Sequence, residues 1–164
     1  MNKTMQQAID RYGDQLAIVV LPMPLELECN KMMTSTEPAH FGACKLARLA
    51  LAVSEVDPTA FVDFHEWLMA DKDNVPEIGK ALAKAYRLAD AKKIRERMTS
   101  PEIEQRIQSD INLYETLAAQ KSKESSAVFG LPVQIVGDQV ISGDTVSGDD
   151  LLAKWQEILG IKPL

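Results

Sequence analysis

The chain has 164 residues, of which 46% are apolar, and its 24 acidic against 18 basic residues give a net charge of −6. This length suits one compact domain that buries about two thirds of its unfolded surface, so folding requires no metal or disulfide. Lys and Arg are scattered among acids, which argues against a nucleic-acid partner and against attraction to anionic lipid.

The amino-terminal residues predict a short helix followed by a buried strand. Residues 2–12 have a helical apolar period, and Gly13-Asp14 ends it. Residues 16–21 form a continuous apolar run rich in β-branched side chains, which is typical of a strand buried on both faces. The apolar face of the helix consists of Met5, Ile9 and Tyr12.

A long helical block follows an irregular loop over residues 26–38. Asp57-Pro58 predicts a helix start with an N-cap and a proline at the first helical position. Ser100-Pro101 opens another helix, and the polar residues 121–126 predict a loop after it. The helical stripes are Ala43, Leu46, Ala47, Ala50 and Leu51; Phe61, Phe64, His65 and Leu68; Val75, Ile78, Leu82 and Tyr86; and Ile103, Ile107, Ile111, Tyr114 and Ala118.

The last quarter of the chain predicts a hairpin and a closing helix. Two β-rich runs, 133–136 and 139–141, are separated by Gly137-Asp138, a two-residue turn signal. Ser147 with Asp150 resembles a capping box. The buried stripe of the closing helix is Leu152, Trp155, Ile158 and Leu159, and Gly160 ends it. Strands flanking a helical block indicate a small sheet covered by helices.

Three passages in this order resemble the DsbA-like branch of the thioredoxin superfamily. Residues 19–25 (VVLPMPL) look like the strand after the active-site helix. Residues 43–68 look like the start of the family's helical insertion, with its Phe-x-x-Phe-His element at Phe61–His65. Residues 129–137 (FGLPVQIVG) look like the cis-proline loop and hairpin. The resemblance implies an α/β thioredoxin-like fold over residues 1–164, with a helical insertion at about 39–121.

One departure from the family concerns its catalytic motif. The family carries Cys-x-x-Cys at the start of its first helix, where the helix N-terminus lowers the thiol pKa. In this sequence that helix begins at or before Met1, so the first central strand and the motif are absent. The missing strand belongs between 16–21 and 133–136. Upstream sequence supplies it, another chain supplies it, or the two strands close into a smaller sheet.

The function implied is therefore the body of a DsbA-like thiol–disulfide oxidoreductase domain, inactive in disulfide exchange as given. The alternative is a redox-inactive thioredoxin-like module that binds peptides or proteins, and a third reading is a helical interaction domain. Partners of the active domain would be protein or peptide thiols and disulfides, including a fused or separate vitamin K epoxide reductase homologue. No cofactor is expected. The location would be cytoplasmic if Met1 is the true start, and extracytoplasmic if a leader precedes it.

Cys29 and Cys44 have three readings: a structural disulfide, two buried thiols, or a redox pair. Similar Cys-Asn and Ala-Cys pairs occur in DsbA-like domains, where a disulfide would stabilise the loop by ~3 kcal/mol on the chain-entropy estimate. His40 with both cysteines makes only three ligands, so no metal site is predicted. His65 lies on an apolar stripe and is expected to pack there.

Pro132 is the residue that the resemblance singles out. In thioredoxin folds the corresponding proline is cis and lies against the catalytic cysteines, and the preceding backbone pairs with bound peptide. The resemblance implies that Leu131 and Pro132 line such a substrate groove here. The plainer reading is a proline that starts an edge strand. Leu131 departs from the family's usual Thr or Val, which puts a catalytic role for that position in doubt.

Overall fold

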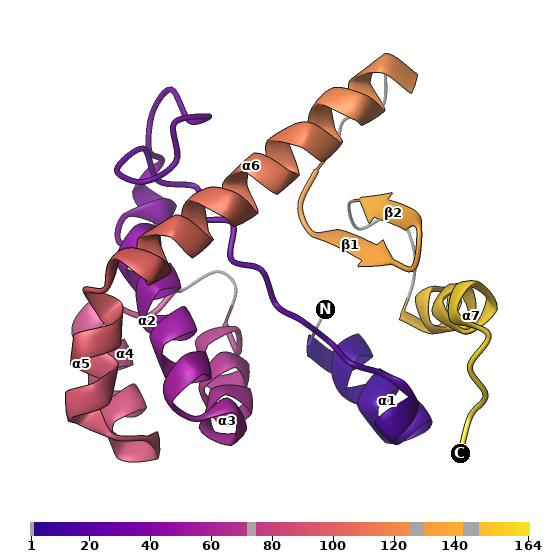
Figure 1. The fold of residues 1–164 in the computed structure, drawn as a ribbon, viewed down its shortest axis with the longest axis horizontal. Helices are drawn as coiled ribbons and strands as arrows, with labels where there is room; N and C mark the ends of the chain where they lie inside the picture. Colours follow the sequence, from indigo (N-terminus) through magenta and orange to yellow (C-terminus); the bar gives the residue numbers. More distant parts are fainter. Residues whose placement is uncertain (1, 72–74, 125–129, 143–147) are drawn as a thin grey trace. The chain divides into compact units, whose positions relative to one another are not determined.

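A computed structural model describes residues 2–71, 75–124, 130–142 and 148–164 (Figure 1). It contains seven helices, two strands and two 3₁₀ turns within these ranges. The helices are α1 (Asn2–Tyr12), α2 (Ala43–Val56), α3 (Pro58–Leu68), α4 (Ile78–Leu88), α5 (Ala91–Met98), α6 (Pro101–Glu124) and α7 (Gly148–Leu159). The strands are β1 (Val133–Val136) and β2 (Gln139–Ser142), and the turns are η1 (Gly13–Gln15) and η2 (Pro38–His40).

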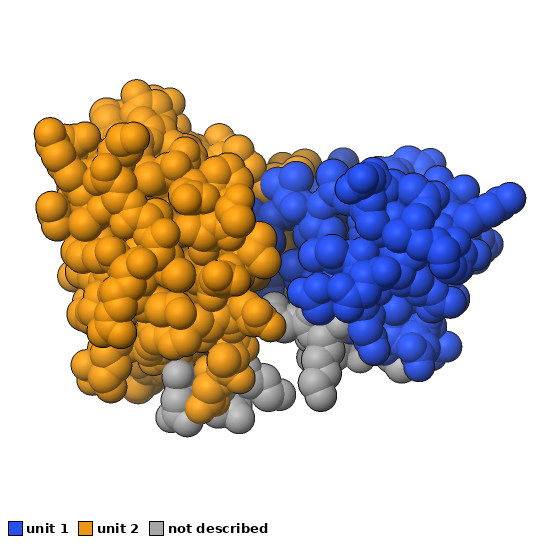
Figure 2. All heavy atoms as spheres, turned by 90° about the horizontal axis from the view of Figure 1, so that it is seen from below, with its two compact units in different colours: residues 1–20, 118–164 blue, residues 21–117 orange. Residues whose placement is uncertain are grey.

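The chain divides into two compact units, coloured separately in Figure 2. Unit 1 combines the two ends of the chain, residues 1–20 and 118–164. Unit 2 is the segment between them, residues 21–117. Each unit has apolar clusters of its own. The helical insertion predicted at about 39–121 falls largely within unit 2, and the prediction of a single thioredoxin-like domain stays a prediction.

The core of unit 1 is built from α1, α7, the hairpin and the segment after η1. Ala8 and Tyr12 of α1 are fully buried, and the Tyr12 hydroxyl donates to the carbonyl oxygen of Leu152 at 3.1 Å. Ile9 is 43% exposed, so the predicted Met5-Ile9-Tyr12 face is only partly correct. The other buried members of this cluster are Val136, Ile141, Leu151, Leu152 and Trp155.

The predicted hairpin forms, and its second strand extends one residue further than predicted, to Ser142. Val136 pairs with Gln139, and the two-residue turn between them contains Gly137 at φ +59°, a conformation that L side chains rarely adopt. Helix α7 then packs on β1, where the Trp155 indole N–H donates to Oε1 of Gln134 at 2.8 Å. The helix ends at Gly160 (φ +64°) as predicted, whereas the proposed cap residue Ser147 lies outside the described residues.

The predicted strand at 16–21 does not form a ladder with any described residue. The only sheet in the described part of the chain is the antiparallel pair β1–β2. Residues 16–20 are neither helical nor in a turn, and Leu16 has extended backbone angles (φ −125°, ψ 129°). The structure therefore does not bear out the predicted strand, because a ladder requires a neighbouring strand that the described residues do not supply.

The helical core of unit 2 is formed by α2, α3, α4 and α5. Its fully buried side chains include Leu49, Phe64, Ala81 and Ile94. Helix α3 begins as predicted, because the Asp57 carboxylate accepts from the amides of Thr59 and Ala60. Helix α5 was not predicted, although Asp90 caps it in the same way through the amides of Lys92 and Lys93.

A second cluster in unit 2 joins α6 to the start of α2. Ile103, Ile107 and Ile111 of α6 are buried as predicted, together with Cys29, Cys44 and Ala47. The loop predicted at 121–126 is wrong as far as the structure describes it, because α6 continues to Glu124. Lys121, Lys123 and Glu124 are good helix formers, and no Gly or Pro interrupts the helix before Glu124.

The protein is thus a mixed helix–strand structure with a small antiparallel sheet, which agrees with the predicted α/β class at this coarse level. No helix in the described ranges combines the length and apolarity needed to cross a bilayer.

Candidate functional site

The Leu131–Pro132 peptide bond, immediately before β1, is cis. This agrees with the isomer predicted for Pro132. Leu131 is 38% exposed and Pro132 is half-buried. The preceding residues 125–129 lie outside the described part of the chain, and the substrate groove assigned to Leu131 and Pro132 stays a prediction.

Segment 16–20 of unit 1 has the burial pattern of a strand without a strand partner. Leu16, Ile18 and Val20 are half-buried, and the first two pack against the unit 1 core. Ala17 and Val19 between them are exposed, Val19 at 70%. No backbone hydrogen bond joins residues 17–20 to another described residue. This alternation with period two is the pattern of a β-strand that has one buried face.

Strand β1 has a second unpaired backbone edge in the same unit. Its only ladder within the described residues is with β2, which occupies one side of the strand. Ile135 in the middle of β1 is 49% exposed. Within the described residues, unit 1 therefore carries two segments, 17–20 and one edge of β1, whose backbone groups have no backbone–backbone hydrogen bond. Such an edge can pair with an additional polypeptide strand.

Cys29 and Cys44 form a disulfide in unit 2, with their Cα atoms 5.9 Å apart. Both residues are buried, at 5% and 0% exposure, and both lie in the cluster with Ile103, Ile107 and Ile111. The structural-disulfide reading of the pair is confirmed, and the reading as two separate thiols is wrong. A buried disulfide packed among apolar side chains is shielded from a thiolate while the loop is closed, which disfavours a catalytic redox role for the pair.

The Glu26 carboxylate caps the helix that carries Cys44. Oε2 accepts from the Cys44 amide at 2.8 Å, and Oε1 accepts from the Gly42 amide at 3.0 Å. Gly42 is the N-cap of α2 at φ +89°, where it has no side chain with which to cap the helix. Glu26 is buried, with 9% of its surface exposed. Its two carboxylate oxygens are the hydrogen-bond acceptors that the first amides of α2 otherwise lack.

A ring of polar contacts fastens the same loop to α2 and α6. Arg48 of α2 pairs with Glu28 at 3.0 Å and with Glu104 of α6 at 3.0 Å. Gln108 donates to Glu104 at 3.1 Å and also to the carbonyl oxygen of Cys29 at 2.8 Å. The last of these contacts is therefore to a cysteine of the disulfide. Loop residues 26–29 are held by one covalent bond and several polar contacts.

The remaining candidate residues do not form a reaction centre. His40 is half-buried in η2, and no group of three or more His, Cys, Asp or Glu side chains in the described ranges is arranged to hold a metal. His65 stacks on Phe61, with ring centroids 5.4 Å apart, and burial lowers the pKa of its imidazole. Both observations agree with the packed histidine that was predicted.

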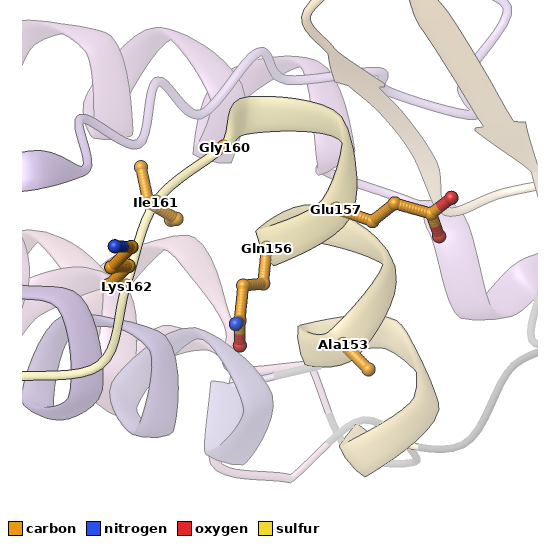
Figure 3. Close-up of a pocket in the computed structure, with 6 residues that line it drawn as sticks. All are labelled: Ala153, Gln156, Glu157, Gly160, Ile161 and Lys162. Atoms are coloured by element: carbon orange, nitrogen blue, oxygen red, sulfur yellow. The ribbon is translucent and has the colours of Figure 1, made fainter.

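A shallow pocket lies at the C-terminal end of α7 in unit 1 (Figure 3). The residues that line it are Ala153, Gln156, Glu157, Gly160, Ile161 and Lys162. The carboxylate of Glu157 points away from the side chains of Gln156 and Lys162. Since binding pockets require polar groups that converge on one point, this hollow is a poor candidate for a ligand site.

Sequence reasoning did not find Glu26 or the Arg48 ring. Glu26 lies 16 residues from Gly42 and 18 from Cys44 along the chain, so no periodic pattern connects them. The sequence offered only an indirect signal. Helix α2 begins after Gly42, which has no side chain to cap it, so an acceptor from a distant residue was to be expected.

No protein-family model, no curated protein and no solved structure matches this chain. The DsbA-like resemblance accordingly stays an expectation drawn from the residues quoted above.

Proposed function

We propose that residues 1–164 are the body of a DsbA-like thiol–disulfide oxidoreductase domain, whose catalytic Cys-x-x-Cys and central strand belong upstream of residue 1. The observation that carries the proposal is segment 16–20. It has the alternating burial of a strand, and its Leu16 and Ile18 pack against the unit 1 core. It has no strand partner among the described residues, and its residues 17–20 form no backbone–backbone hydrogen bond there.

The unpaired edge of β1 supports the same proposal. A strand placed beside both 16–20 and β1 would satisfy two rows of backbone groups in one unit. An added strand would replace backbone–water hydrogen bonds by backbone–backbone bonds, each of which contributes about 0.5–1.5 kcal/mol to stability. The expected thioredoxin-like sheet contains a strand at this place in its order.

The order of the elements gives further support. Helix α1, the extended segment, the hairpin and α7 all belong to unit 1, and unit 2, with helices α2 to α5 and most of α6, interrupts it. This order is compatible with the helical insertion that the DsbA-like resemblance implies. In the complete domain the first thiolate would attack a substrate disulfide, release one substrate thiolate and form a mixed disulfide. The second cysteine would then attack the sulfur of the first and displace the other substrate thiolate, so the substrate gains two electrons and the two cysteines become a disulfide.

The alternative is a redox-inactive thioredoxin-like module that binds extended peptides at the same edges. It is favoured by the state of the two cysteines, since both are used in the buried Cys29–Cys44 disulfide and the chain has no third. A chain without a free thiol cannot begin thiol–disulfide exchange, but unpaired strands still bind an extended polypeptide.

The reading frame upstream of Met1 distinguishes the two functions. A β-rich run followed by Cys-x-x-Cys within about 15 codons supports the oxidoreductase, because that is the length of one strand and a helix start. A stop codon or an unrelated sequence supports the binding module.

An insulin-reduction assay with dithiothreitol provides the biochemical test. We expect the 164-residue chain to leave insulin precipitation at the uncatalysed rate, and a chain extended upstream through the Cys-x-x-Cys to accelerate it. The extended chain with both added cysteines changed to serine is the matched control. Turnover by the 164-residue chain would contradict the proposal, since it would assign redox activity to Cys29 and Cys44.

A further inference from the structure

Residues 26–42 of unit 2, here called the disulfide loop, are attached to the unit by few apolar contacts. Cys29 is the only apolar side chain of this loop that is buried. Leu27, Met32 and Phe41 are 48%, 37% and 67% exposed. The helical core of the unit, by contrast, is built entirely from side chains of α2 to α5 and the residues that follow them, with no member from the loop.

The attachments that do hold the loop are covalent and polar. The disulfide joins Cys29 to Cys44, and Glu26 accepts the amides of Gly42 and Cys44. The Arg48 pair with Glu28 is solvent-exposed on the Glu28 side, at 49% exposure of that side chain, and such pairs contribute little. Gln108 of α6 also donates to the carbonyl oxygen of Cys29, and the buried Asn30 donates to the carbonyl oxygen of Pro24, both at 2.8 Å. The disulfide is the only covalent attachment among these.

We infer that the Cys29–Cys44 disulfide is a redox-controlled latch: its reduction opens the disulfide loop while the helices α2 to α5 stay folded. Segments with few buried apolar contacts open locally at low free-energy cost unless a cross-link holds them. The buried cluster formed by α2 to α5 contains no side chain of the loop, so we expect it to keep its packing when the loop opens. This inference is independent of the proposed function.

The reductant is a dithiol. Its first sulfur attacks one sulfur of the disulfide during a transient opening of the loop, and a mixed disulfide forms. Its second sulfur then displaces the bound cysteine. The dithiol loses two electrons and two protons and becomes a cyclic disulfide, and Cys29 and Cys44 each gain one electron and one proton.

Opening also alters the start of α2. When Glu26 moves away, the amides of Gly42 and Cys44 lose their acceptor oxygens and become available to solvent. Phe41, Leu27 and Met32 move with the loop. The latch therefore changes the exposure of a helix N-terminus and of a loop that carries three large apolar side chains.

Amide hydrogen exchange on the full chain tests the latch, with and without dithiothreitol. The reporting amides are those of Leu27, Cys29, Gly42 and Cys44, which donate to Thr36, to the Glu26 carbonyl and to the Glu26 carboxylate. We expect reduction to accelerate their exchange about 100-fold, the factor that corresponds to closing a loop of this length by a cross-link. Amides of α4 should keep their exchange rates.

Two results would overturn the inference. Unchanged protection of the four loop amides after complete reduction would mean that Glu26 and the Arg48 ring hold the loop without the disulfide. Joint loss of protection in the loop and in α4 would mean that reduction unfolds the helical core as well.

A variant with Cys29→Ala and Cys44→Ala separates reduction from other effects of the reagent. Its loop amides should exchange as fast as those of the reduced protein, and dithiothreitol should change nothing further. The amides of α7 in unit 1 serve as an internal control. A double variant whose loop amides stay as protected as in the oxidised protein would contradict the latch.

Discussion

Two buried carboxylates of unit 2, Glu26 and Asp110, differ in how many of their oxygens have a hydrogen-bond partner. Glu26 accepts two backbone amides at the start of α2, so both of its oxygens are used. Asp110 of α6 is 8% exposed, and only its Oδ1 has a partner, the Nε of Arg106 at 3.1 Å. Its Oδ2 is buried without a hydrogen-bond partner among the described residues. Burial raises the pKa of Asp110, and the neighbouring Arg106 opposes this increase only in part.

The raised pKa of Asp110 predicts that its negative charge lowers the stability of the protein at neutral pH. When the pKa of an acid is higher in the folded state than its unfolded value of about 3.9, the free energy of unfolding falls as the pH rises from the unfolded pKa to the folded pKa. We therefore expect Asp110→Asn to raise the free energy of unfolding at pH 7 by up to about 1 kcal/mol. The gain should be absent near pH 3, where Asp110 is protonated, and urea denaturation at the two pH values measures it.

The control for Asp110 is Asp63→Asn, which removes the same charge from an exposed position on α3. It should leave the free energy of unfolding nearly unchanged at pH 7. A less stable Asp110→Asn variant at pH 7 would show that the ion pair with Arg106 outweighs the cost of burial.

At the scale of elements, segment 16–20 differs from its sequence prediction in how its two faces are buried. Its apolar run predicted a strand buried on both faces, whereas only one face is buried, with Ile18 in the unit 1 core and Val19 exposed. Sequence cannot tell these cases apart when both faces carry apolar residues. The difference depends on which neighbours cover each face.

The alternating burial predicts unequal effects of two adjacent truncations. Ile18→Ala removes a half-buried side chain that packs on the unit 1 core, so we expect it to lower the free energy of unfolding by about 1–2 kcal/mol. Val19→Ala, at a position 70% exposed, should change it by less than about 0.5 kcal/mol. Denaturant titration in the Trp67→Phe background, followed by Trp155 fluorescence, measures both. Equal effects at the two positions would contradict the strand-like burial of this segment.

The helices were predicted with uneven success, for physical reasons. Asp57-Pro58 marked the start of α3 because the cap is a local interaction within four residues. Helix α5 was not predicted, because Ile94 is its only buried residue. A single apolar position cannot show a helical period. The end of α6 was placed too early because its last residues are polar but remain good helix formers.

At the scale of the whole molecule, each unit contains one of the two tryptophans. Trp67 packs against the α2–α5 core of unit 2, and Trp155 lies in the core of unit 1. Separate cores allow separate unfolding transitions. The Cys29–Cys44 disulfide lies wholly within unit 2, so it constrains the unfolded chain of that unit alone.

Single-tryptophan variants therefore distinguish the two units. In Trp155→Phe, where Trp67 is the reporter, we expect dithiothreitol to lower the free energy of unfolding by at most about 3 kcal/mol, the chain-entropy value for such a loop. In Trp67→Phe, where Trp155 is the reporter, the reagent should leave the midpoint unchanged. An equal shift of both transitions would show that the units unfold together.

The sequence by itself determined the local features of this protein: most helix positions, the Asp57 cap, the Gly137-Asp138 turn, and the apolar stripe of α6. These depend on residues within a few positions of one another, so their pattern is visible in the chain. Only the tertiary structure decided that Cys29 bonds to Cys44, that Glu26 caps α2, and that segment 16–20 has no strand partner among the described residues. Each of these depends on segments distant in sequence, whose pairing is set by packing and hydrogen bonding in the folded chain rather than by local propensity.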